Sequence, residues 1–324
     1  MHNKKRILHR LWNYIYQYKW SAFSALLLSL ASNLLALIGP MLSGYAIDAI
    51  TPGKGLVQFD KVFKYCALMI IFYIASSLLS YVLSIIMINL SQKVISRMRS
   101  DMFNKLMDLP VSYFDTHQAG EIISRMSYDI DTVNSSLSTD LLQIFTSIIT
   151  VSLSLAMMIF LSPSLTLIFV VTVPVSILFT RYMAKKVRPF FHKRSEELGN
   201  LNGFTEEIIT GLKTIKIYNR EDYITQRFDR KNEDAVNAYY NADYYGSMTG
   251  PSVNFINNIS LALVSVFGSL LYLFGNITLG NLSSFVLYSR KFSGPINEAA
   301  NIFSELQSTF AAAGRIFELM DEDT

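Results

Sequence analysis

The sequence predicts an all-α membrane protein with six transmembrane helices that continue as long extensions on the cytoplasmic side. Of the 324 residues, 51% are hydrophobic and only 16% are charged, and the charged residues leave long gaps between them. Soluble domains usually carry about a quarter charged residues. The composition therefore excludes an ordinary water-soluble enzyme and a disordered chain, and the single cysteine excludes a disulfide scaffold.

Four runs without Asp, Glu, Lys or Arg locate the spans. They cover residues 20–47, 65–92, 141–180 and 244–289, and are 28, 28, 40 and 46 residues long. About 20 apolar residues in a helix cross a bilayer core of roughly 30 Å, so the first two runs hold one span each and the last two hold two each. Ser162-Pro163-Ser164 divides the third run, because proline lacks the helical N–H, and the segment from Gly275 to Gly280 divides the fourth.

Positive charges orient these spans. The N-terminal segment and the connections 93–140 and 181–243 carry five, five and twelve Lys and Arg residues, whereas the remaining connections carry three in all. Positive loops stay in the cytoplasm. We therefore expect a multi-pass protein of a cell membrane, plasma or bacterial inner, with both termini and both long connections inside.

The two long connections are expected to form helical stalks. At 48 and 63 residues they are too long for turns, and their apolar residues recur every three or four positions. In the first connection, Pro110 stops this pattern. The N-terminal segment has its own apolar helical face with Trp12, beside several basic residues, which is typical of a helix lying along the membrane interface. An ordinary packed helix is the alternative.

Short motifs in the connections indicate a family. They are LPVSYFD at 109–115, GEIISR at 120–125 with Asp129, EEIITGLKTIK at 206–216 with Glu221, and RIFELMD at 315–321 after Phe292, Pro295 and Ile296. In this order they resemble the transmembrane domain of ABC exporters of the type IV architecture, over nearly the whole chain. The resemblance implies an interfacial elbow helix at 1–19, a six-helix transmembrane domain at 20–314, and a linker at 315–324 toward a nucleotide-binding domain.

That nucleotide-binding domain is not found in the sequence. The 324 residues contain no Gly-x-x-x-x-Gly-Lys-Ser/Thr loop, so nothing here cradles ATP phosphates. We expect ATP and Mg on a nucleotide-binding domain, which either belongs to a longer chain or is a separate polypeptide. The four histidines show no metal-ligand spacing, no catalytic constellation is recognised, and the net charge of +3 gives no argument for nucleic acid.

The resemblance also implies a mechanism and partners. The chain would be the translocation unit of an ATP-driven exporter for amphipathic or lipophilic compounds, such as drugs, lipids or peptides, working by alternating access. Its partners would be a second transmembrane domain, in a homodimer or heterodimer, nucleotide-binding domains and the lipid bilayer. A nucleotide-independent channel and a membrane sensor domain are the alternatives.

Two sets of residues are expected to carry this function. The resemblance places coupling helices around 115–121 and 218–223, which gives the coupling residues Asp115, Thr116, Gln118, Gly120, Glu121, Tyr218, Arg220, Glu221 and Tyr223. Polar stripes on the fifth and sixth spans predict a substrate pathway lined by Asn254, Asn257, Asn258, Arg290, Asn297 and Asn301.

Arg290 is the pathway residue whose exposure to lipid would cost the most free energy. It lies about 11 residues into the sixth span, roughly 16 Å from its outer end. An arginine facing lipid at such a depth costs about 2.5 to 3.5 kcal/mol. Arg290 is therefore expected either to face the aqueous pathway or to pair with a carboxylate, such as Glu298 or an acid of a partner chain.

Overall fold

The computed structural model describes residues 2–50 and 57–322, without side chains at positions 2–4, 297, 299 and 300. The described residues form helices and short connections, with no β-strand among them. The elements are α1 (His2–Tyr16), α2 (Lys19–Ile50), α3 (Phe59–Asp108), α4 (Val111–Thr116), α5 (Ala119–Ser124), the π-helical η1 (Arg125–Asp129), α6 (Ile130–Ser135), the π-helical η2 (Ser136–Asp140), α7 (Leu141–Leu161), α8 (Pro163–Thr210), α9 (Leu212–Ile217), α10 (Glu221–Ser247), α11 (Thr249–Leu273) and α12 (Leu279–Met320).

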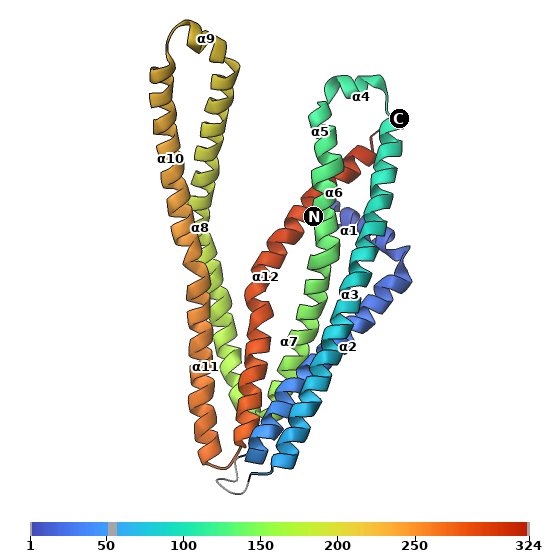
Figure 1. The fold of residues 1–324 in the computed structure, drawn as a ribbon, viewed down its shortest axis with the longest axis vertical. Helices are drawn as coiled ribbons and strands as arrows, with labels where there is room; N and C mark the ends of the chain where they lie inside the picture. The colour runs from blue at the N-terminus through green and yellow to red at the C-terminus, as the bar shows by residue number, and fades with distance from the viewer. Residues whose placement is uncertain (1, 51–56, 323–324) are drawn as a thin grey trace. The chain divides into compact units, whose positions relative to one another are not determined.

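The chain forms two compact units, and each is described by itself (Figure 1). Unit 1 comprises Met1–Thr166 and Phe267–Thr324, and unit 2 comprises Leu167–Val266. Unit 1 thus contains α1 to α7 and α12, whereas unit 2 contains α9, α10 and most of α8 and α11. Both α1 and the last turns of α12 belong to unit 1.

The helices are long and apolar enough for a membrane protein, which confirms the predicted fold class. Among the described residues, five helical stretches could cross a bilayer by length and composition: Lys19–Ile50, Phe59–Asp108, Ala119–Leu161, Pro163–Thr210 and Glu221–Leu273. The sixth predicted span corresponds to α12, an unbroken helix of 42 residues that contains Arg290 and Lys291. α12 is not among the five.

Helix ends lie where local chemistry predicts them. Ser162 is extended, with a φ of −161°, between the end of α7 and the start of α8 at Pro163. Gly275 has a φ of +73° after α11, and its N–H and that of Asn276 donate to the carbonyls of Tyr272 and Leu271. This is the Schellman arrangement that ends helices at glycine. Both predicted turns are confirmed.

The extensions are also present. The 50 residues of α3 give a length of about 75 Å at 1.5 Å per residue, far more than the roughly 30 Å of a bilayer core. As predicted, α3 stops just before Pro110. The 48 residues of α8 pass through Pro174 and Pro189 without a break.

The core of unit 1 lies where the end of α12 packs on α1, α3 and α6. Its fully buried side chains come from three helices and include Met98 and Met102 of α3, Ile130 of α6, and Ile316 and Leu319 of α12. Residues 315–320 of the predicted linker are the last turns of α12. Their apolar side chains hold α12 against the helix extensions.

Unit 2 is held together differently. Within it, α8 and α10 lie side by side (Figure 1) and contact each other through rings and cations. Phe190 stacks on Tyr245 with ring centroids 4.3 Å apart, and Arg194 pairs with Asp243 at 3.1 Å and lies over the ring of Tyr239. The buried residues of α10 are only alanines. Unit 2 thus leaves much of its apolar surface open.

Candidate coupling site at the helical tips

The first tip is formed by α4 and α5, which stand at the end of unit 1. His117 and Gln118, both extended, separate these two short helices. The predicted coupling segment 115–121 therefore covers the end of α4 and the start of α5 rather than one helix. The five residues expected to couple here are all exposed: Asp115, Thr116, Gln118, Gly120 and Glu121.

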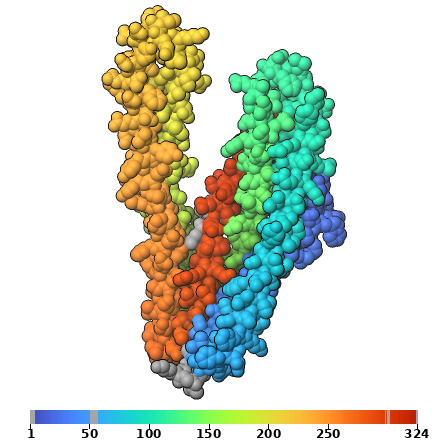
Figure 2. Space-filling model, viewed as in Figure 1, coloured from blue at the N-terminus to red at the C-terminus, as the bar shows by residue number. Residues whose placement is uncertain are grey.

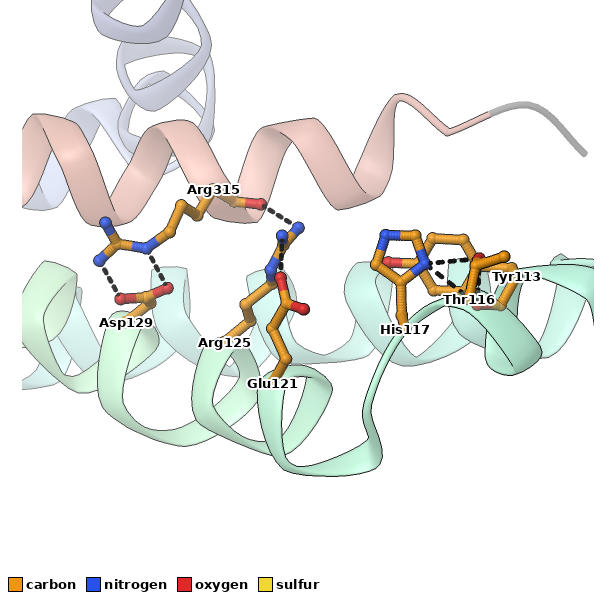
Figure 3. Close-up of polar contacts among 7 residues, drawn as sticks. All are labelled: Tyr113, Thr116, His117, Glu121, Arg125, Asp129 and Arg315. Carbon is orange, nitrogen blue, oxygen red and sulfur yellow. Dashed lines mark hydrogen bonds and ion pairs between the residues drawn. The ribbon is translucent and has the colours of Figure 1, made fainter. Parts of the chain in front are cut away.

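Tyr113 anchors the first tip. Its side chain is buried, and its ring stacks on that of His117 with centroids 4.1 Å apart (Figure 3). The His117 Nδ1 lies 3.0 Å from the Tyr113 carbonyl oxygen, to which the Thr116 hydroxyl also donates. Burial raises the pKa of the Tyr113 hydroxyl. These contacts fix the backbone of the turn.

An ion pair joins the first tip to the end of α12 (Figure 3). The Arg315 guanidinium donates from Nε to Asp129 Oδ2 at 2.9 Å and from Nη2 to Oδ1 at 2.5 Å. The Asp129 side chain is 4% exposed, and this two-bond geometry is the strong form of a charged hydrogen bond. The bonds with Asp129 raise the pKa of Arg315.

Arg125 extends this connection to the exposed tip. Its Nη1 donates to the backbone oxygen of Arg315 at 3.3 Å, and its Nη2 donates to Glu121 Oε1 at 2.6 Å (Figure 3). A continuous series of contacts therefore runs from Glu121, through Arg125, to the last turns of α12. A displacement of the tip would act directly on α12.

The sequence predicted the tip but not its attachment. The sequence gives Asp129 no role within its motif and places Arg315 in a linker. The available signal was the position of Asp129 next to the apolar stripe of Ile130, Val133 and Leu137, all buried in the structure. A carboxylate at such a position needs a cation or strong donors.

Asp321, in the predicted linker, is also fixed to the fold. Asp321 accepts from Arg6 at 3.1 Å and from Arg10 at 2.7 Å, and the Arg10 guanidinium lies 4.4 Å from the ring centroid of Phe317. The Tyr14 hydroxyl donates to Asp101 of α3 at 2.8 Å. One face of α1 is thus packed, as in the alternative interpretation, while Leu8, Trp12 and Tyr16 stay exposed as an interfacial helix requires.

The second tip, in unit 2, differs from its prediction. The short helix is α9, over Leu212–Ile217, whereas the expected segment 218–223 forms a turn and the start of α10. Asn219, with a φ of +49°, ends α9: its N–H donates to the Lys216 carbonyl and that of Arg220 to the Ile215 carbonyl. Because this Schellman turn at Asn219 ends the helix, the short helix lies before the predicted segment 218–223 rather than within it.

The second tip is open on its surface. In the space-filling view, α9 and the start of α10 form the end of unit 2 (Figure 2). Ile217 and Tyr218 are 79% and 71% exposed, and α9 has no buried residue. Arg220, Glu221 and Tyr223 are exposed beside them. Apolar and charged groups are therefore available here for contact with another protein.

The pathway residues lie on two helices that belong to different units. In unit 2, Asn254 and Asn258 of α11 are exposed and Asn257 is partly buried. In unit 1, Arg290 and Asn301 of α12 are exposed, while the side chain of Asn297 lies outside the described set. That the two groups line one pathway stays a prediction.

The structure gives Arg290 and its neighbour Lys291 different roles. Pro40 lacks the N–H that would bond the Ala36 carbonyl within α2, and the Lys291 ammonium donates to this oxygen at 3.3 Å. Tyr288 likewise donates to the Leu37 carbonyl at 2.5 Å. Lys291 therefore has a structural role: side chains of α12 donate hydrogen bonds to the carbonyl oxygens that precede Pro40 in α2.

Arg290 has no such task in the described structure. The described structure does not form the pairing with Glu298 that the sequence allowed, and Glu298 Oε2 accepts from Gln143 Nε2 at 2.7 Å. No other carboxylate among the described residues forms an ion pair with Arg290. The described part of the chain also contains no group of three His, Cys, Asp or Glu side chains that could hold a metal ion.

Comparison with known proteins establishes the family. Residues 22–296 match the family model described as the ABC transporter transmembrane region. The chain belongs to this family. The resemblance inferred from the tip motifs is therefore confirmed, and α2 to α11 are helices of an ABC transporter transmembrane region.

Relatives of this ABC transporter chain come from several bacteria. An ABC transporter ATP-binding protein of Bacillus subtilis is 35% identical over 98% of the chain and 52% of its own length. A fatty acid ABC transporter ATP-binding/permease protein of Mycobacterium tuberculosis is 36% identical over 84% of the chain and 43% of its own. A protein of Staphylococcus aureus, named for multidrug export, is 26% identical over 98% of the chain and 56% of its own. The chain thus spans about half the length of these relatives.

Proposed function

We propose that this transmembrane region is the translocation unit of an ATP-driven exporter of amphipathic compounds. The observation that carries the proposal is the pair of tips at the ends of long helices. The first is attached to α12 through Arg125 and Arg315, and the second exposes Tyr218 and Glu221 for contact. Relatives that are named as ATP-binding/permease proteins support the same function.

Nucleotide-driven movement would enter through the tips. The residues of this chain do not fit ATP, since its sequence contains no phosphate loop, so ATP and Mg would be bound by a nucleotide-binding domain. A helix such as α3, about 75 Å long, converts a small rotation at its tip into a displacement within the membrane. Asp115, Glu121, Tyr218 and Glu221 are the residues we assign to contact with that domain.

A second transmembrane domain is the proposed partner of this chain. Unit 2 supports this proposal, because it exposes the large side chains Val236, Tyr239 and Tyr240 along α10. Apolar side chains along an extension beyond the membrane call for a protein partner. We propose a dimer in which each chain supplies one set of tips.

The substrate we propose is an amphiphile with an anionic group. Arg290 supports it, because the guanidinium is exposed in α12 and forms no ion pair with the described residues. A guanidinium binds a carboxylate or phosphate through two parallel hydrogen bonds. The fatty acid transporter among the relatives agrees with such a substrate.

Transport into inside-out vesicles tests this function with the complete transporter. Uptake of a long-chain carboxylate and of an alkylammonium of equal chain length would be compared, with and without ATP. Arg290→Gln should lower ATP-dependent uptake of the carboxylate about tenfold, the equivalent of about 1.4 kcal/mol, and leave the cation unaffected. Arg230→Gln, at an exposed position on α10, is the matched control.

Two outcomes would contradict the proposal. Equal loss for both compounds would make Arg290 a structural residue, and ion conductance without nucleotide would identify a channel. The proposed orientation is tested separately by single cysteines in a Cys66→Ala background, since the Cys66 thiol is exposed. An impermeant thiol reagent should label position 276 in intact cells, and labelling at 115 or 221 would overturn the orientation.

A further inference from the structure

An apolar cavity lies beside α1 in unit 1. It encloses about 170 Å³ between α1, α2, α3, η2, α7 and α12. Its walls include Leu11 and Trp12 of α1, Ala25 of α2, Met87 and Leu90 of α3, and Phe310 of α12. The coupling tips and the predicted pathway residues contribute nothing to its lining, so the cavity needs its own explanation.

The chemistry of the walls selects hydrocarbon over water. Of the hydroxyl groups that line the cavity, that of Ser91 donates to the Ile88 carbonyl and that of Thr309 to the Glu305 carbonyl. The Ser29 hydroxyl is buried and has no hydrogen-bond partner among the described residues. A buried water needs two to four polar partners, and an apolar cavity of about 150 Å³ stays dry but accepts a hydrocarbon such as benzene.

The rim of the cavity carries the residues of a membrane interface. Leu8 and Trp12 line the cavity, and the exposed Lys5 and Tyr16 share their face of α1 by helical spacing. The Lys19 ammonium lies 5.7 Å from the ring centroid of Tyr16. Trp and Tyr with nearby lysines anchor at lipid headgroups, and lysines attract their phosphates.

The cavity is deep enough for part of an acyl chain that enters from this rim. On α2, which begins at Lys19, the lining extends from Ala22 to Ser29, about 10 Å along the helix axis. The polar end of an occupant would thus meet Lys19, at the start of α2, and its chain would pass Ala25 toward Ser29.

We propose that this cavity binds part of one acyl chain of a phospholipid, whose phosphate lies at Lys19. The occupant would pack against α1 and α12 together, because both helices line the cavity. The proposal is independent of the transported substrate. It requires only that the chain lies in a bilayer, which its family membership supplies.

Photolabelling in the bilayer tests the proposal. The full chain would be reconstituted into phosphatidylglycerol vesicles that contain a phospholipid with a diazirine on one acyl chain. After irradiation, peptide mass spectrometry should find label on Met87, Leu90 and Leu137, which are each 7% exposed and thus shielded from bulk lipid. Label restricted to exposed positions such as Leu78 and Tyr81 would overturn the proposal.

A cavity-filling variant adds the second measurement. Ala25→Phe places a ring in the cavity and should abolish labelling of Met87 and Leu90, while exposed positions keep their label. Ala67→Phe, at an exposed position of α3 outside the cavity, should leave both unchanged. Undiminished labelling of the buried residues in a folded Ala25→Phe protein would contradict the assignment. If that variant does not fold, the wild-type map decides. Buried labelling by a single-chain diazirine amine, but not by the phospholipid, would assign the cavity to another ligand.

Discussion

The two helical tips have different relations to their own chain. At the first, Tyr113 of α4 packs in the core, Glu121 of α5 pairs with Arg125 of η1, and the buried Asp129 of η1 pairs with Arg315 of α12. At the second, α9 buries none of its residues, and hydrogen bonds within its own turn hold it. In the proposed function, the first tip would transmit movement within the chain, whereas the second would mainly offer a surface for contact.

The energetics follow from this contrast. A charge that is buried with its partner is costly to leave alone, because the remaining ion cannot recover its hydration. An exposed tip, in contrast, contributes little to folding, and substitutions there usually change stability by less than about 0.5 kcal/mol. Variants of the first tip should therefore lower stability, whereas variants of the second tip should change coupling and leave stability nearly unchanged.

The largest effect is expected at Arg315. Arg315→Met leaves the Asp129 carboxylate buried without a cation, and breaking a fully buried pair costs about 3 to 5 kcal/mol. Since the Arg315 side chain is 47% exposed, we expect a loss of about 2 kcal/mol. Thermal unfolding by tryptophan fluorescence measures it, because Trp12 and Trp20 both lie in unit 1.

Asp129→Asn added to Arg315→Met is the control for that variant. It removes the orphaned charge and should restore most of the lost stability. If the Arg315→Met protein unfolds like the wild type, the ion pair does not attach the first tip to the fold, and the contrast between the two tips is wrong.

A smaller effect is expected at Asn219. In the left-handed region an ordinary residue costs about 1 to 2 kcal/mol, which glycine avoids and asparagine partly avoids. Asn219→Ala should therefore lower the free energy of local unfolding of the second tip by about 1 kcal/mol, and trypsin should cut faster at Lys216 and Arg220. Asn219→Gly should be cut like the wild type. The fluorescence transition of unit 1 should not move in either variant, and a shift there would contradict the independence of the second tip.

An effect of similar size, which fades at high pH, concerns the contact of α1 with α3. Burial and then the bond to Asp101 raise the pKa of Tyr14 above its usual value of 10. Because the folded pKa is the higher one, this contact stabilises fully below about pH 10 and is lost as the pH rises through the folded pKa. Tyr14→Phe should lose about 1 kcal/mol at pH 8 and progressively less above pH 10. A difference that stays constant to high pH would exclude the bond to Asp101 as its source.

Local chemistry made part of this structure predictable. The turn at Ser162 and Pro163, the left-handed Gly275 and the stop before Pro110 depend on neighbouring residues, and each lies where the sequence places it. The second tip is shifted because a left-handed Asn219 was not anticipated. An asparagine adopts this conformation less regularly than glycine does, so the sequence signal is weak.

Contacts between distant segments were not predictable from one sequence. Asp129 and Arg315 are 186 residues apart, and only the packing of α12 on α6 brings them together. Lys291 likewise gains its role from Pro40 of another helix. The positions of Asp129 and Lys291 beside apolar residues indicate that each needs a partner, but the identity of the partner depends on the fold.

The central claim is that the tips couple a nucleotide-binding domain to the membrane. The most direct measurement is substrate-stimulated ATP hydrolysis and transport by the complete transporter carrying Tyr218→Ala, Arg220→Ala and Glu221→Ala together. Because these side chains are exposed, folding and basal hydrolysis should persist, while stimulation and transport fall about tenfold, the equivalent of about 1.4 kcal/mol of lost contact. A matched triple variant at the exposed Asp229, Arg230 and Glu233 of α10 should behave as the wild type. Full stimulation in the first variant would contradict the claim.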